Sequence, residues 1–93
     1  MRTDAEADEI HLRVPALPAM AAVVDVTVRV LGARAHLVDA DLRAIRRDVS
    51  DAFTALVDAS DARPVDVQVL VRRGSLQVDL VGATGARRVI APA

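Results

Sequence analysis

The 93-residue sequence contains no cysteine, tryptophan or tyrosine, and it has a single phenylalanine. Without cysteine, the chain forms neither disulfide bonds nor thiolate metal sites. One aromatic side chain offers almost no surface on which bases or sugars stack. Lysine is also absent, so all twelve basic residues are arginine. Because the net charge is only −1, we expect no strong attraction to nucleic acid or to acidic membranes.

Long uncharged apolar runs are missing as well. No such run approaches the roughly 20 residues that cross a bilayer, and the acidic, polar stretch from Met1 to Glu9 does not fit a secretory signal. We therefore predict a cytoplasmic protein with a flexible acidic leader over residues 1–8 and one domain over 9–93. Apolar residues make up 53% of the chain, so valine, alanine and leucine must build the core.

Alternating apolar and polar residues predict strands at both ends of this domain. Residues 9–14 alternate and end before a proline, which cannot donate to a strand ladder. Residues 65–81 contain two alternating runs around Arg73-Gly74, which is typical of a hairpin. A turn over Gly82 to Gly85 precedes a last short edge strand at Val89–Ile90. Between these strands, residues 39–59 carry one apolar stripe at helical spacing.

Residues 19–35 fit two structures. Val24, Val26, Val28 and Val30 alternate with polar residues, which slightly favours a strand. The same residues also fit a helix with one apolar face. Pro18 would stand at its start, and Gly32 would help to end it near its last turn. That face would contain Met20, Val23, Val24, Thr27, Val28 and Leu31.

Two segments carry a resemblance to a known family. Residues 12–18 read Leu-Arg-Val-Pro-Ala-Leu-Pro, and residues 49–57 read Val-Ser-Asp-Ala-Phe-Thr-Ala-Leu-Val. The first resembles the strand, Pro-Ala-x-Pro, helix opening of the anti-sigma-factor serine kinases of bacterial partner switches. These kinases belong to the GHKL (Bergerat-fold, histidine-kinase-like) ATPases. The second segment is similar to their N-box helix, usually Val-Ser-Glu-Ala-x-Thr-Asn-Ala-Val.

The resemblance implies a helix over 19–35 and an α+β fold. We expect a two-layer sandwich, in which a four-stranded, mainly antiparallel sheet carries two helices on one face. The resemblance implies a partial GHKL-like fold, and we expect it to lack the ATP lid, because the chain stops before a lid would follow.

The same resemblance implies that the nucleotide site is degenerate. The N-box glutamate, which positions the attacking group, corresponds to Asp51, and the magnesium-holding asparagine corresponds to Ala55. In the next conserved motif of the family, an aspartate recognises the adenine. Gly82 occupies that position in this chain. Magnesium and nucleotide need several oxygen ligands. We therefore expect no catalytic residue, no cofactor and no metal.

Other residue clusters give weaker functional signals. His11 and His36 have no third ligand at suitable spacing, so a zinc site is not indicated. Capping and solvated-face roles account for the aspartates of residues 39–58. The pairs Arg46-Arg47, Arg72-Arg73 and Arg87-Arg88 have no aromatic residues between them and fit a protein-interface rim better than nucleic acid.

The helix at 19–35 would carry a second apolar stripe, which a two-layer fold leaves uncovered. With the first strand, this stripe predicts a homodimer interface formed by Ile10, Leu12, Ala19, Ala22, Val26, Val30 and Ala33. The main hypothesis is a non-catalytic regulator of transcription that binds a sigma factor, an anti-sigma antagonist or a related kinase. The alternatives are a minimal ATP-dependent serine kinase that uses Asp51 as a base, and a DNA-binding regulator.

Overall fold

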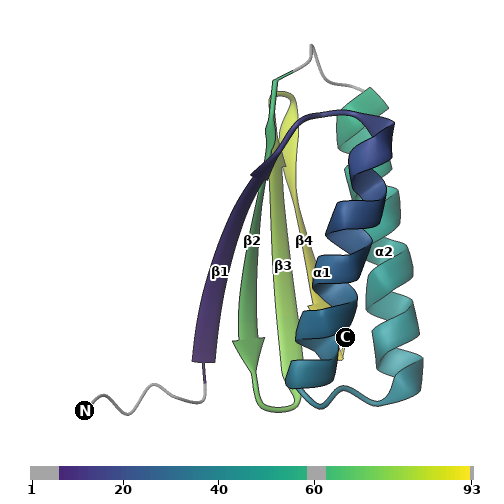
Figure 1. Cartoon of the computed structure of the whole chain (residues 1–93), viewed down its shortest axis with the longest axis vertical. Coiled ribbons are helices and arrows are strands. Elements are labelled where there is room, and N and C mark those ends of the chain that lie inside the picture. The colour runs from purple at the N-terminus through teal and green to yellow at the C-terminus, as the bar shows by residue number, and fades with distance from the viewer. Residues whose placement is uncertain (1–6, 59–62, 93) are drawn as a thin grey trace.

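The computed structural model describes residues 7–58 and 63–92, which form two layers (Figure 1). One layer is a four-stranded antiparallel sheet in the order β1-β2-β3-β4. Its strands are β1 (Ala7–Val14), β2 (Val65–Arg72), β3 (Ser75–Gly82) and β4 (Gly85–Ala91). The other layer consists of helices α1 (Ala21–Arg34) and α2 (Asp39–Asp58), which lie side by side and antiparallel on one face of the sheet. The predicted α+β sandwich is confirmed.

Some predicted boundaries change. Strand β1 begins at Ala7, so residues 7 and 8 belong to the sheet and not to the expected leader; residues 1–6 of that leader lie outside the described part. Strand β4 runs over Gly85–Ala91 and is longer than the predicted Val89–Ile90. The hairpin turn lies at Arg73-Gly74 as expected, and Gly74 has a φ of 85°.

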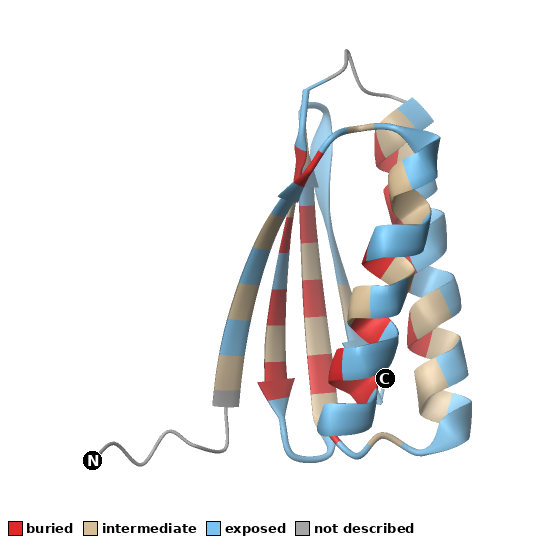
Figure 2. Ribbon diagram, viewed as in Figure 1, coloured by how far each residue is buried: buried red, intermediate tan, exposed pale blue. Residues whose placement is uncertain are grey.

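Aliphatic side chains from both layers form the core. The inward residues of β2 and β3 are almost fully buried, and Phe53 of α2 is 1% exposed. Figure 2 shows this alternation as buried bands along both strands. Strand β1 contributes half-buried Ile10 and Leu12 and buried Val14 to the same face. The sheet residues that are fully inside are Val65, Val67, Val69, Leu76, Val78 and Leu80.

Residues 21–34 form a helix, preceded by a 3-10 turn at Pro18–Met20. Val24, Val28 and Leu31 are buried at spacings of four and three, which places them on one helical face toward the sheet. Val26 and Val30, which a strand would have placed beside Val24 and Val28, point outward and are exposed. The prediction that Val23 lies on the core face is wrong, because Val23 is 44% exposed.

Helix α1 ends in a Schellman motif around His36. The Leu37 N–H donates to the Gly32 carbonyl at 3.1 Å, and the His36 N–H donates to the Ala33 carbonyl at 3.0 Å. His36 has a φ of 62°, a left-handed conformation that glycine usually adopts. Gly32 therefore lies within the last helical turn and is not the left-handed residue at the helix end. It packs toward Leu42, whose Cδ1 would lie 2.4 Å from a Cβ added at Gly32.

We predict that His36→Gly stabilises the protein, because glycine adopts the left-handed conformation without a Cβ clash. The free energy of unfolding in urea should rise by about 0.5–1 kcal/mol. The matched control is His11→Gly on strand β1, where glycine has only its entropic cost and should lower stability. Equal effects of the two substitutions would contradict this account of the helix end.

Candidate interaction surfaces

The nucleotide-site positions that the family resemblance singles out lie on α2 and at the end of β3. Asp51 is exposed and Ala55 is half-buried on α2. Gly82 packs against the same helix, because a Cβ added there would lie 3.3 Å from Leu56 Cδ2. The strand end and the helix are thus in van der Waals contact beside these positions. In residues 7–58 and 63–92 no three histidine or acidic side chains gather as a metal site would require.

An apolar groove lies between α1 and the free edge of the sheet. Ile10 of β1 lines it together with Val26, Thr27, Val30 and Leu31 of α1, around a hollow of about 260 Å³. Val26 and Val30 are 45% and 57% exposed. The remaining members of the predicted stripe, Ala19, Ala22 and Ala33, are also exposed.

The structure therefore brings three of the seven predicted interface residues together in this groove. Ile10 and the two valines line one surface, although the chain separates them by more than a dozen residues. Leu12 is half-buried and packs against the core, as Ile10 does, but among the described residues it is not one of those that line the groove. Val23, which was assigned to the core, instead adds to the exposed apolar surface of α1.

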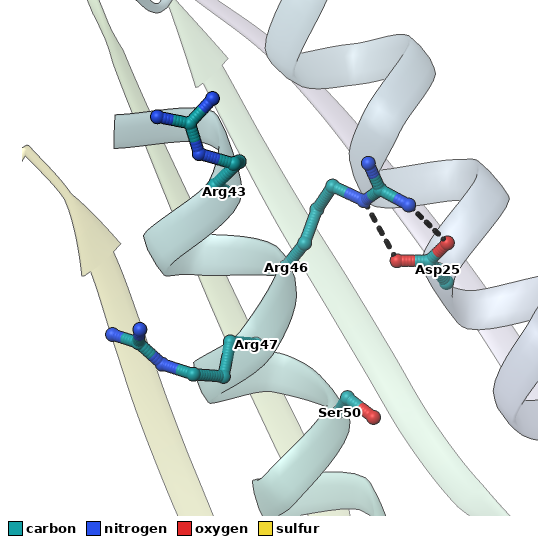
Figure 3. Close-up of a pocket in the computed structure, with 5 residues that line it drawn as sticks. All are labelled: Asp25, Arg43, Arg46, Arg47 and Ser50. Atoms are coloured by element: carbon teal, nitrogen blue, oxygen red, sulfur yellow. Dashed lines mark hydrogen bonds and ion pairs between the residues drawn. The ribbon is translucent and has the colours of Figure 1, made fainter. Parts of the chain in front are cut away.

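A second hollow, of about 440 Å³, lies on the outer side of the two helices. It is lined by Asp25 of α1 and by Arg43, Arg46, Arg47 and Ser50 of α2 (Figure 3). Arg46 reaches across to Asp25 and donates two hydrogen bonds, from Nε and from Nη2, each of 2.9 Å. Arg43 and Arg47 extend from α2 away from this pair.

The Arg46–Asp25 pair links the helices electrostatically. The hydrogen bonds from Arg46 hold the pKa of the Asp25 carboxyl below its usual value, and nearby Arg29 acts in the same direction. The same contact raises the pKa of Arg46. The sequence analysis missed this hollow, because Asp25 and Arg46 meet only through the packing of α1 on α2. One feature of the sequence points to this hollow. The spacing of Arg43, Arg46, Arg47 and Ser50 places them on one face of the helix.

The face of the sheet that the helices leave open carries several paired polar side chains, together with Val81 and Ile90, which are each 47% exposed. Arg13 donates to Asp66 at 2.8 Å, and Arg88 donates to Asp79 at 2.8 Å. His11 lies 3.7 Å from Asp66. Gln68 donates to Glu9 across the β1–β2 pair. The charged side chains of this face are therefore largely paired with each other, and the apolar groove lies on the other side of the sheet.

No model of a known protein family matches this chain, and no curated protein sequence is significantly similar to it. In the described part of the chain, neither helix is long and apolar enough to cross a membrane.

We predict that Ala55→Asn does not create Mg–ATP binding. The substitution supplies one oxygen ligand on α2, but Gly82 offers no carboxylate and Leu56 packs against it. Isothermal titration of the variant with Mg–ATP should show no binding heat. The wild type serves as the control, and micromolar binding by the variant would contradict the prediction.

We also predict that the coupling between Asp25 and Arg46 depends on pH. Since the folded-state pKa of Asp25 is lowered, its stabilising effect is present above the unfolded-state value of 3.8 and is lost as the pH falls through the folded-state pKa. Urea unfolding of Asp25→Asn, Arg46→Gln and the double variant gives the coupling free energy. This coupling should be favourable at neutral pH and should shrink toward zero as the pH falls through the lowered folded-state pKa of Asp25. A coupling that stays constant with pH would show that the pair contributes through packing and not through charge.

Proposed function

We propose that this protein is a non-catalytic, protein-binding regulator that resembles the anti-sigma-factor kinases and works as a homodimer in the cytoplasm. Its partner would be a sigma factor, an anti-sigma antagonist or a related kinase. The observation that carries the proposal is the exposed valine surface of α1 beside the free edge strand β1. A helix that is apolar on its outer face as well as its core face needs a second partner surface.

The degenerate nucleotide positions support a binding role over catalysis. The side chain of Ala55 has no atom that coordinates magnesium, and Gly82 has no side chain to read a base. The contact between Gly82 and Leu56 brings an aliphatic side chain to the position that the resemblance assigns to an aspartate. The family likeness therefore supports a related partner class and not a retained kinase reaction.

Strand β1 is suited to pair with a second copy of itself. It lies at the edge of the sheet, and its outward side chains toward the open face are Glu9, His11 and Arg13. In an antiparallel pair centred on His11, Glu9 of each copy would lie opposite Arg13 of the other. Ile10 would face Leu12 on the core side. Such pairing would join two sheets and bring both copies of α1 to the same side of the interface.

We predict that Val26→Asp converts the dimer to a monomer, because it places a carboxylate in the apolar interface without a partner. Analytical ultracentrifugation should detect the change. The matched control is Val81→Asp, since Val81 is 47% exposed, close to the 45% of Val26, but lies on the open sheet face. The control should remain dimeric. A wild type that sediments as a monomer at high concentration would rule out this interface.

The regulatory part of the proposal is tested by affinity capture from a bacterial extract with mass spectrometry. The wild type and Val81→Asp should both retain a sigma factor or a partner-switching regulator. Recovery of neither class of protein would count against the proposed function even if the protein is dimeric.

A further inference from the structure

The sheet has two edges, and the dimer proposed above uses only one of them. Strand β1 forms one edge and β4 forms the other. Pairing of β1 with a second copy would give one continuous sheet with a β4 strand at each end. A free edge presents unpaired backbone groups on which a further strand can pair. The dimer therefore stays closed only if β4 does not pair in its turn.

The free backbone groups of β4 belong to alternate residues. A two-residue turn joins β3 to β4 between Gly82 and Gly85, which are cross-strand partners. In such a hairpin the partners beside the turn exchange two hydrogen bonds, and bonded pairs then alternate with non-bonded pairs along the ladder. It follows that the N–H and C=O groups of Ala86, Arg88 and Ile90 point away from β3, toward the free edge.

The side chain of Arg87 belongs to the helical side of the sheet. Arg87 pairs in register with Leu80, which is fully buried in the core, and the side chains of opposite residues lie on the same face. Arg87 itself is exposed, because it stands at the edge of that face. Among residues 7–58 and 63–92, its guanidinium has no hydrogen bond or ion pair with another side chain. The edge strand thus carries an unpaired positive charge on the apolar side of the sheet.

A charge in this position opposes the addition of a strand. A strand paired with β4 would lie beside Arg87 and would take water from its guanidinium group, which costs free energy without a new partner. In a symmetric antiparallel pair centred on residue 87, the Arg87 side chains of the two copies would also lie directly opposite, and like charges so placed are destabilising. Inward charged side chains on edge strands are one of the ways in which proteins protect their sheets from pairing.

Strand β1 presents an apolar edge on the same side of the sheet. Its central and last residues there are Ile10, Leu12 and Val14, which pack against the core. Asp8 is the charged residue on this side, and it forms an ion pair of 3.1 Å with Arg34 of α1. The charge on β1 is therefore balanced within the protomer, whereas the inward charge on β4 is not.

We infer that Arg87 keeps the β4 edge from pairing, so that association through β1 stops at two copies. The closed dimer in this statement rests on the proposed function, whereas the protection of β4 does not. Arg87 is thus a specificity-determining residue, because it decides which edge of the sheet takes part in association.

The test replaces this charge with a β-branched side chain in Arg87→Val. If the wild type is a dimer, the variant should form open-ended chains of dimers, with a mass in analytical ultracentrifugation at least about twice that of the wild type. The matched control is Arg88→Val, which removes the same charge from the next residue of the same strand. Arg88 lies on the open face and is paired with Asp79 at 2.8 Å, so this control should sediment like the wild type.

Hydrogen exchange identifies the surface through which the variant associates. In Arg87→Val the outward amides of Ala86, Arg88 and Ile90 should exchange at least about tenfold more slowly than in the wild type, because a new strand bonds or covers them. Arg87→Thr is a second neutral variant that should behave in the same way. Circular dichroism confirms that each variant keeps its helices.

Three outcomes would overturn the inference: a wild-type mass for both Arg87→Val and Arg87→Thr, equal association of Arg87→Val and Arg88→Val, or association without protection of the β4 amides. Failure of the proposed dimer is a separate result. If the wild type is a monomer, Arg87→Val should still form a dimer through β4. If the wild type is a dimer, Val26→Asp/Arg87→Val should stop at two copies, because only the β4 edge remains.

Discussion

The packing of the helices on the inner face of β2 and β3 is the contact on which the rest of the structure depends. The chain has one aromatic residue, Phe53, and it lies in this core at 1% exposure. All other core residues are aliphatic. These smaller side chains must pack closely to bury as much apolar surface as a core with more aromatic residues would. The valines of β2 and the Leu-Val-Leu series of β3 provide an even surface for this purpose. Both helices are positioned by this surface, and the two-layer arrangement determines which helical faces remain outside.

The two helices use this arrangement differently. Helix α2 turns its apolar stripe to the sheet and presents arginine, aspartate and serine to solvent. Helix α1 also buries one face, but Val26 and Val30 remain on the other. The open sheet face provides a comparison within the same molecule, since its charged side chains are paired across strands. Val81 and Ile90 are exposed on that face as well, but Val26 and Val30 differ in lining a groove together with Ile10, which supports an interaction role for α1.

Sequence patterns alone predicted α2 and the β2–β3 hairpin correctly, because the apolar residues of each follow one clear period. Residues 21–34 were ambiguous, since Val24, Val26, Val28 and Val30 alternate as in a strand. Val24 and Val28 are also four residues apart, which fits a helix, and the choice depended on a family resemblance. Strand β4 was underestimated because Gly85 to Arg88 lacks alternation, and its pairing with β3 rests on the backbone. The left-handed conformation of His36 was not predicted, because the sequence pattern pointed to Gly32 at the helix end.

For the candidate sites, the apolar stripe of α1 was predicted from helical spacing. The Asp25–Arg46 contact was not, because it depends on how the two helices pack and has no local sequence pattern.

Self-association would also affect the stability of this small domain. A chain of 93 residues buries a smaller share of its surface than a larger one, and here the core is almost wholly aliphatic. Covering the valines of α1 would add apolar burial that the monomer lacks, so dimerisation and folding would be coupled. In the proposed dimer, separating the two copies would expose the apolar groove to water again, so the interface would be expected to persist.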